Sequence, residues 1–481
     1  MDATKRKWLA LVLLAATQFM IVIDVSIVNV ALGPIKKALD FSEANLTWVL
    51  NAYTLTFGGL LLLGGRMADL LGRRRVFQIG IVIFTLGSLL CGLSQNSTML
   101  IVARALQGLG AAIVSPAALS ILTVTFEEGA ERNKALGVWG AVAGLGGAVG
   151  VLAGGFLTDW LSWRWIFWVN VPIGVIALVA TWLLLTESKV DGADRSFDIL
   201  GGVVGTAGLA LLIYGFVQTA EKGHGWGTGL TAGTLIGAVV LLAGFIFIES
   251  KARSPLMPLR LFKLRGVAGA NLVGFLLGCS IFAMFYFLSR YMGEVQGLGP
   301  KEIGVRYLLV AGTIIVAAAV SQGLVTKLGV RPVLTVGMTL LAAGLAYFAF
   351  IRVNGGYARD LVPGFILSGV GLGFSFIPVA IGALEGVEPR DAGVASGIVN
   401  TAQQVGGAVG LGVLGSIANI GTDRYLSDNN ITGGGFPPAP ALVQGYHWAF
   451  WVGVVLSVLG IVASLLMIRG GKLKDSAAAA H

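Results

Sequence analysis

Charged residues are scarce in this chain. Only 12% of its residues are Asp, Glu, Lys or Arg, whereas soluble globular domains carry about 25%. Hydrophobic residues make up 56% of the chain, and the mean hydropathy is +0.85. Such a composition cannot cover a globule with polar surface, so the sequence predicts a protein solvated mainly by lipid.

Cysteine, histidine and nucleotide-binding loops are also scarce or missing. The two cysteines, Cys91 and Cys279, lie in apolar runs and imply no disulfide framework. The three histidines form no metal-ligand pattern with Cys, Asp or Glu, so no metal or cofactor is predicted. The sequence has neither a G-x-x-x-x-G-K-[ST] phosphate loop nor a nucleophile beside a base. We therefore expect no enzyme, and any energy would have to come from an ion gradient or from the gradient of a substrate itself.

Long apolar runs dominate what is present. A membrane-spanning helix needs about 20 apolar residues, and the length of the runs and their lack of alternation favour helices over strands. The sequence predicts an all-α membrane protein whose fourteen spans lie near residues 8–32, 46–65, 76–94, 98–124, 134–158, 164–186, 199–219, 229–249, 266–289, 303–324, 330–351, 361–384, 393–419 and 446–468.

The net charge of +9 does not indicate nucleic acid binding. About two thirds of the Lys and Arg residues fall in the loops on the side of the two termini, which predicts that both termini are cytoplasmic. The chain is thus expected to be a multi-pass protein of a plasma membrane, in contact with lipid.

A repeat divides the chain. The pentapeptide GGAVG occurs at 146–150 in the fifth span and again at 406–410 in the thirteenth. Parallel six-helix halves are a transporter architecture with the substrate site between them. We predict an N-terminal half at 1–190, an inserted helix pair at 191–250 and a C-terminal half at 251–475. Residues 476–481 are interpreted as a non-native expression tail.

Asp24 is an acid inside the first apolar run. A carboxyl group near the middle of a bilayer costs roughly 2.5–3.5 kcal/mol on insertion scales, so such residues usually have a function. The alternative is a structural acid that bonds to Ser26 or Asn29 and never titrates.

The loop after the second span reads GRMADLLGRRR from Gly65 to Arg75. Its glycines allow a tight turn, and Asp69 could cap a helix or pair with an arginine. This pattern resembles the G-x-x-x-D-x-x-G-R-[RK] motif of the major facilitator superfamily, and it predicts a conformational latch of Gly65, Asp69, Gly72, Arg73 and Arg74. The corresponding loop of the second half keeps Gly329 and Arg331 but lacks the acid. The alternative is a simple positively charged anchor.

Two further motifs fit this resemblance. Arg104 in the fourth span is similar to the superfamily's arginine motif, which implies a role in proton transfer; a purely structural arginine is the alternative. Gly146, Gly150, Gly154 and Gly155 resemble its antiporter motif and form a groove at helical spacing. Val151 stands where that motif has a proline, which leaves close packing as the simpler explanation of these glycines.

Several other stretches resemble the fourteen-span drug:proton antiporter subfamily (QacA/EmrB type). They are Asp24 to Asn29, Trp48 with Tyr53, the WRWIFWVNVPIG segment at 163–174 and the GVASGIVNTAQQVGG segment at 393–407. The resemblance covers the whole chain. It implies a bacterial inner-membrane protein with the major facilitator fold.

The sequence then predicts a mechanism. Asp24 would carry the proton, Arg104 would favour its release in one conformation, and a cationic or proton-bearing substrate would compete with the proton. Aromatic, methionine and amide side chains would bind lipophilic molecules without demanding one shape. The candidates for substrate binding are Gln18, Met20, Asn29, Asn51, Tyr53, Phe57, Asn271, Phe275, Phe282, Tyr286, Phe374, Phe376, Asn400 and Gln404. Contact with lipid or neighbouring helices is the alternative for each of them.

The favoured function is proton-coupled export of lipophilic cationic or neutral compounds, by a monomer that needs no cofactor beyond the proton gradient. A transporter of the same fold with a dedicated substrate remains open, such as a lipid flippase, a metabolite exporter or a symporter. A membrane receptor or scaffold that moves nothing is the alternative from another class.

Overall fold

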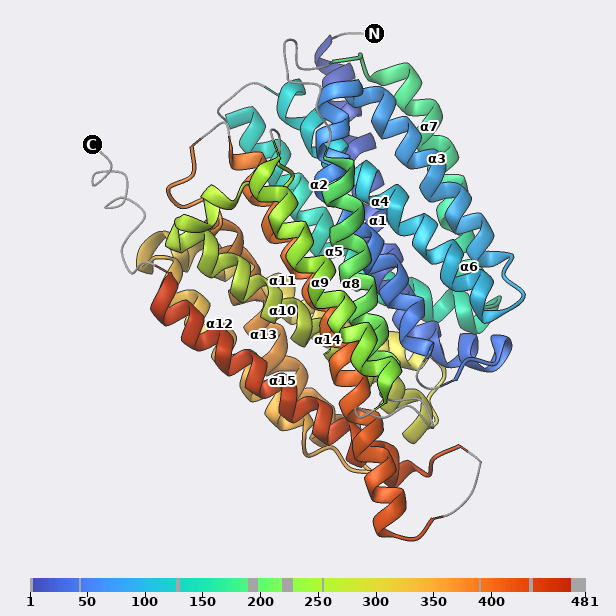
Figure 1. Ribbon diagram of the computed structural model, residues 1–481. Helices are drawn as coiled ribbons and strands as arrows, with labels where there is room; N and C mark the ends of the chain where they lie inside the picture. The colour runs from blue at the N-terminus through green and yellow to red at the C-terminus, as the bar shows by residue number, and fades with distance from the viewer. Residues whose placement is uncertain are drawn as a thin grey trace.

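The structure is a computed structural model, and it describes residues 3–42, 45–126, 130–188, 198–218, 228–252, 255–388, 391–431 and 436–468. All regular elements in these ranges are helices (Figure 1). Thirteen of the described helical segments are long and apolar enough to cross a membrane. The fourteenth is α5, a helix of 31 residues from which several side chains are not described. The predicted all-α membrane fold is confirmed, with thirteen candidate spans among the described residues and α5 as a further long helix.

The helices occur in three groups along the chain. The first group is α1 (Ala3–Leu39), α2 (Trp48–Leu71), α3 (Arg73–Gly92), α4 (Ser97–Thr125), α5 (Ala130–Trp160), α6 (Trp165–Trp168) and α7 (Asn170–Leu184), and α6 and α7 together make one span. The inserted pair is α8 (Ile199–Gln218) and α9 (Gly229–Lys251). The last group is α10 (Arg265–Arg290), α11 (Pro300–Leu328), α12 (Val330–Phe348), α13 (Val362–Gly382), α14 (Ala392–Asp428) and α15 (Ala439–Met467).

Short helical turns complete the list. They are 3-10 turns at Asn45–Thr47 and Leu259–Lys263 and π-helical turns at Tyr291–Val295 and Tyr357–Leu361.

Corresponding turns join the second and third helices of each half. Gly72 separates α2 from α3 with φ 108°, and Gly329 separates α11 from α12 with φ 89°. A side chain would strain either backbone conformation, so glycine permits two long helices to meet in a one-residue turn. The same device at the same place supports the relationship between the halves.

The repeated pentapeptide has the same packing role in both halves. In α5, a Cβ atom on Gly146 would lie 2.9 Å from Val22, and one on Gly150 would lie 3.0 Å from the Ile23 carbonyl oxygen of α1. In α14, a Cβ atom on Gly406 would lie 2.9 Å from the Cα atom of Phe275 in α10. Each pentapeptide therefore lets the fifth helix of its half approach the backbone of the first.

This packing predicts a position-specific effect on stability. Gly150→Ala should lower the free energy of unfolding by about 1–3 kcal/mol, because the new methyl group overlaps α1. Gly147→Ala, three residues earlier on α5, is the matched control, because no atom lies within 4 Å of its Cβ position. Thermal unfolding of the purified variants measures the difference. Equal melting temperatures for the two variants would contradict the role assigned to Gly150.

The inserted pair lies along the boundary between the two halves. Thr206 of α8 packs against Gly59 of α2, and Ile213 of α8 packs against Gly412 of α14. Leu55, Ile213 and Ala408 belong to one buried cluster, which joins α2, α8 and α14. Helix α9 packs on the outside of α8, and Figure 1 shows the pair running in front of α14.

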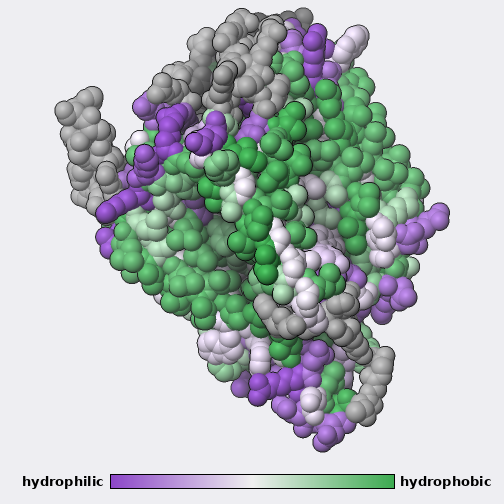
Figure 2. All heavy atoms as spheres, in the orientation of Figure 1, coloured by the Kyte–Doolittle hydropathy of each residue, from purple (hydrophilic) through white to green (hydrophobic). Residues whose placement is uncertain are grey.

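Apolar side chains cover the outside of the bundle. Trp182, Phe247 and Leu466 are 70%, 65% and 75% exposed, respectively. Figure 2 shows hydrophobic surface across the middle of the visible face, with hydrophilic groups toward its ends. This distribution suits a protein in a bilayer, and the chain is a multi-pass membrane protein. The predicted domain boundary at 190 lies outside the described residues, and that at 250 falls in the last turn of α9, so both stay predictions. The predicted tail at 476–481 also lies outside the described residues.

Candidate functional site

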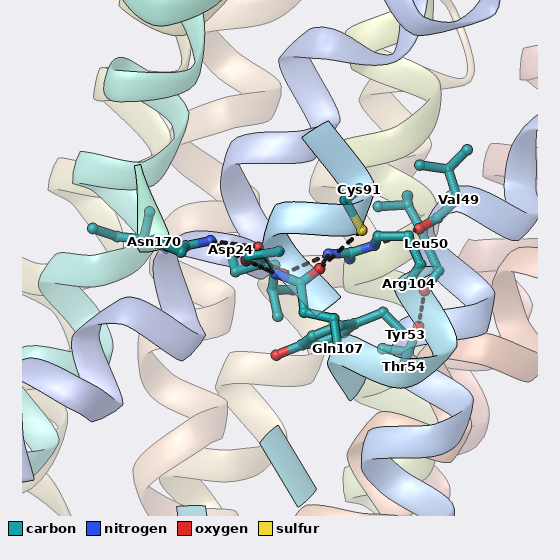
Figure 3. Close-up of polar contacts among 12 residues, drawn as sticks. Asp24, Val49, Leu50, Tyr53, Thr54, Cys91, Arg104, Gln107 and Asn170 are labelled. Carbon is teal, nitrogen blue, oxygen red and sulfur yellow. Dashed lines mark hydrogen bonds and ion pairs between the residues drawn. The ribbon is translucent and has the colours of Figure 1, made fainter. Parts of the chain in front are cut away.

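Asp24 lies near the middle of α1 and has no exposed surface. Three donors surround its carboxylate (Figure 3): the Oδ2 atom accepts from Arg104 Nη1 at 2.5 Å, and the Oδ1 atom accepts from Gln107 Nε2 at 2.6 Å and from Asn170 Nδ2 at 2.9 Å. The carboxylate thus faces donors from α4 and α7, inside the first half and away from lipid.

The guanidinium of Arg104 is also fully buried. Its Nε atom donates to the Val49 carbonyl oxygen at 3.0 Å, and its Nη1 atom donates to Gln107 Oε1 at 2.8 Å. The Cζ atom of Arg104 lies 4.3 Å from the centre of the Tyr53 ring and 5.7 Å from the centre of the Phe167 ring. A buried ion pair is tolerated when further hydrogen bonds satisfy both partners. This pair meets that condition on the carboxylate and on most of the guanidinium.

The neutral side chains of this site were not predicted from the sequence to belong to it. Gln107 Nε2 and Asn170 Nδ2 both donate to Ser88 Oγ, at 2.6 and 3.2 Å, and Cys91 Sγ contacts Gln107 Oε1 at 3.6 Å. Gln107 and Asn170 are polar residues within apolar runs, which is a usable signal, because uncharged polar groups also need partners inside a membrane. We name Asp24, Ser88, Arg104, Gln107 and Asn170 the buried polar cluster.

The alternative partners for Asp24 are engaged elsewhere. Ser26 donates to the carbonyl oxygens of Val22 and Ile23, and the Asn29 amide donates to the Val25 carbonyl oxygen. Because Asp24 has no exposed surface, a substrate cannot touch its carboxylate in this conformation. In this conformation, a substrate cation therefore cannot compete directly with the proton for the Asp24 carboxylate.

The loop between α2 and α3 contains the predicted latch. The Asp69 side chain lies outside the described residues. An acid that the prediction did not include, Glu187, accepts the backbone N–H groups of Arg74 and Arg75 at 3.1 and 3.2 Å. A Cβ atom on Gly72 would lie 2.7 Å from Glu187 Oε1. A carboxylate at the N-terminus of α3 neutralises the helix dipole.

The other predicted latch residues lie around the same turn. Arg73 donates its backbone N–H to the Ser188 carbonyl oxygen, and Arg74 Nη2 donates to the Trp182 carbonyl oxygen. Gly65 of α2 faces Pro116 of α4. These contacts join the α2–α3 turn to the end of α7, and a role as a conformational latch stays a prediction.

The two halves meet at the end of the bundle opposite the start of α1. A Cβ atom on Gly155 of α5 would lie 2.7 Å from the Pro300 carbonyl oxygen of α11, whereas Gly154 faces α1 together with Gly146 and Gly150. Lys36 Nζ of α1 lies 3.5 Å from Glu294 Oε1, which follows α10. Arg290 and Tyr446 also donate to Glu294 Oε2, at 2.6 and 3.2 Å.

The Lys36–Glu294 contact should hold this end closed. Lys36→Gln removes a half-buried ion pair between the halves. If the pair stabilises the closed state by about 1 kcal/mol, its removal shifts the equilibrium between closed and open states about fivefold toward the open state. Lys37→Gln is the control, because the neighbouring lysine is exposed. Distances between spin labels on α1 and α11 at this end report the open fraction. An unchanged distribution for Lys36→Gln would show that the pair does not secure the closed state.

Some of the predicted substrate-binding residues share a cavity. Phe282, Phe376, Asn400 and Gln404 line a cavity of about 160 Å³ between α10, α13 and α14, together with Leu277, Gly278, Ile281 and Gln403. Its walls offer aromatic faces and amide groups, and none of these eight residues carries a charge.

The remaining candidates lie elsewhere. Phe374 lines a separate apolar groove of about 490 Å³ between α11 and α13. Met20, Tyr53, Phe57 and Tyr286 are buried among neighbouring helices, and Asn51 is buried with its amide unpartnered. Gln18 accepts from Ser115, Asn29 and Asn271 donate to carbonyl oxygens of their own helices, and Phe275 is half-buried beside Gly406. Substrate binding by any of these residues stays a prediction. Among the described residues, no group of His, Cys, Asp and Glu could hold a metal ion.

Comparison with known proteins identifies the class. The family model of the Major Facilitator Superfamily matches residues 14–411, so the chain belongs to this superfamily. It is a membrane transporter and not an enzyme, as predicted, and the resemblance drawn from its motifs is confirmed.

Relatives extend over nearly the whole chain. The puromycin resistance protein of Streptomyces alboniger is 39% identical, over 94% of this chain and 90% of that protein. The cephamycin export protein of Amycolatopsis lactamdurans is 38% identical, with the same coverage. Among solved structures, an inward-facing bacterial homologue of the human lysosomal transporter Spinster matches with a TM-score of 0.66, covering 96% of this chain and 98% of its own at 16% identity, which shows the fold alone.

Proposed function

We propose that this protein exports lipophilic small molecules from the cytoplasm in exchange for protons. The observation that carries the proposal is the buried pair of Asp24 and Arg104 at mid-span, in a superfamily whose members move solutes by alternating access. The similarity to resistance and export proteins supports an antibiotic or a similar toxic compound as the substrate.

The pair suggests how a proton acts on the structure. Protonation of Asp24 removes the charge that Arg104 neutralises, so the bonds joining α1, α4 and α7 weaken. Because Asp24 has no contact with the cavity, proton and substrate are coupled through the conformation of the halves and not through a shared charge. The substrate then needs no positive charge, and the cavity walls, which carry no charged residue, do not select for one.

The loop charges give the direction. In the sequence, about two thirds of the Lys and Arg residues fall in the loops on the side of the two termini, which supports a cytoplasmic location for the end that holds the start of α1. The contacts of Lys36 with Glu294 and of Gly155 with Pro300 are then extracellular. With this orientation, the contacts between the halves support a conformation that is closed toward the outside, which in the proposed cycle is the state that receives a substrate from the cytoplasm.

A dedicated exporter is the second candidate. Two relatives at 39% and 38% identity are each named for one antibiotic, whereas a relative from Mycobacterium tuberculosis at 32% is named for multidrug resistance. The small cavity with its amide-rich wall favours a narrow range of substrates. A receptor or scaffold that transports nothing receives no support from these relatives.

Proton flux in vesicles tests the proposal. The purified chain, reconstituted with a pH-sensitive dye inside, should move protons when puromycin or another candidate drug is added, and a pH gradient should drive drug accumulation. A protonophore should abolish the accumulation. A rate of drug transport that changes with neither the pH gradient nor the protonophore would refute proton coupling.

A further inference from the structure

The donors around Asp24 suit only its charged form. All three groups that contact the carboxylate donate: Arg104 Nη1, Gln107 Nε2 and Asn170 Nδ2. A protonated Asp24 gains an O–H group that must itself donate, and none of the three groups that contact the carboxylate offers it an acceptor in this arrangement. A buried O–H without an acceptor is costly. Proton uptake therefore requires one neighbour to change from donor to acceptor.

An amide side chain can make this change by turning about its last bond, because it carries an oxygen and an NH₂ group on opposite sides. Two amides contact Asp24 Oδ1, but they are not equivalent. Gln107 Oε1 already accepts from Arg104 Nη1 at 2.8 Å and contacts Cys91 Sγ at 3.6 Å. Asn170 Oδ1 is buried and accepts no hydrogen bond. Turning Gln107 would break bonds at both of its ends, whereas turning Asn170 breaks bonds only at its nitrogen.

We propose that Asn170 is the acceptor for protonated Asp24 and that its amide turns over each time Asp24 gains or loses the proton. A proton from water binds Asp24 Oδ1, Asn170 Nδ2 withdraws, and Asn170 Oδ1 accepts the new O–H. Arg104 stays on Oδ2 throughout. Deprotonation reverses the step. The proposal rests on the proposed titration of Asp24 and adds a second residue to it.

Ser88 is placed to follow the turn. Its Oγ atom accepts from Asn170 Nδ2 at 3.2 Å and from Gln107 Nε2 at 2.6 Å while Asp24 is charged. A hydroxyl group can also donate, so Ser88 can direct its proton to Asn170 Oδ1 after the turn. Because Asn170 is the first residue of α7 and Asp24 lies in α1, the amide transmits the protonation state between two helices of the first half.

Infrared difference spectroscopy between alkaline and acidic pH tests the turn. Wild-type protein labelled with ¹³C in the asparagine side chains should show a carboxylic acid band from Asp24 and, at the same pH midpoint, a fall in one asparagine C=O stretching frequency as Asn170 Oδ1 accepts a hydrogen bond. The asparagine signal should vanish in Asn170→Leu and in Asp24→Asn. It should persist in Gln107→Leu, the matched control on the same carboxylate oxygen.

The outcomes separate the two proposals. If Asp24→Asn removes no acid band, Asp24 does not titrate and the proposed function fails. If the acid band is present but the asparagine signal is missing or survives Asn170→Leu, only the role of Asn170 is overturned.

Transport gives a second readout. Asn170→Leu should slow proton-driven export about tenfold, the scale of one lost hydrogen bond to a charged group, but should preserve drug–drug exchange. Asn170→Ser, which can still donate and accept, should recover part of the rate; no recovery from a folded Ser variant would count against the turn.

Discussion

Asp24→Asn should abolish proton-driven export while leaving the fold and drug binding intact. Asparagine has nearly the shape of protonated Asp24 but cannot release a proton, so the protein would be held in the protonated form of the cycle. We expect the rate of pH-driven drug accumulation to fall by about a hundredfold or more, as when an essential proton-transfer group is removed. Exchange of labelled for unlabelled drug across the same vesicles should continue, because it needs no proton.

The control for this result is an exposed acid. Asp428 has a side chain that is 68% exposed, and its ion pair with Arg424 lies within one helix. Asp428→Asn should transport at the wild-type rate, because an exposed pair of this kind contributes little. Full pH-driven export by Asp24→Asn would refute the assignment of Asp24 as the proton carrier.

Arg104→Met should have the largest effect on stability. It leaves the Asp24 carboxylate buried without a counter-charge, and removing one partner of a buried ion pair costs about 3–5 kcal/mol. The loss should depend on pH in a definite direction. At acidic pH, Asp24 is protonated and carries no charge, so the variant regains stability; as the pH rises, the uncompensated charge develops and stability falls. Thermal unfolding across a pH series measures this slope.

The double variant Asp24→Leu with Arg104→Met separates the charge from the packing. Replacing both members of a buried pair with apolar groups is often nearly neutral. We expect the double variant to unfold close to the wild-type temperature at every pH and to be inactive in proton-driven export. If it were as unstable and as pH-dependent as Arg104→Met alone, the instability would not arise from the charge of Asp24.

The helices were predictable because the bilayer imposes one length scale on every span. The apolar run at 266–289 corresponds to α10 (Arg265–Arg290), and the run at 330–351 to α12 (Val330–Phe348). The insertion between the halves followed from the repeated pentapeptide. The position of α8 against α2 and α14 did not follow, because nearly uniform apolar helices carry little information about which face meets which neighbour.

The residues of the proposed proton site were only partly predictable from the sequence. Asp24 and Arg104 stand out because a charge within a span is rare, but Gln107 and Asn170 do not, because amides within spans are common enough to have several roles. Glu187 and Glu294 were not predicted as site residues, because acids near the ends of spans are ordinary. The cavity residues Phe282 and Gln404 could not be separated from buried ones such as Tyr53, since that distinction depends on the angles at which the helices pack.

The placement of α8 and α9 has a consequence for entry from the bilayer. Two halves that rock against each other have two lateral seams, one where α2 meets α14 and the other where α5 meets α11. Since α8 packs against both α2 and α14, it covers the first seam in this conformation, and a molecule dissolved among the lipid tails faces a helix there. Lateral access for a lipid-dissolved substrate is then limited to the seam between α5 and α11. The inserted pair thus makes the two lateral seams of the transporter unequal.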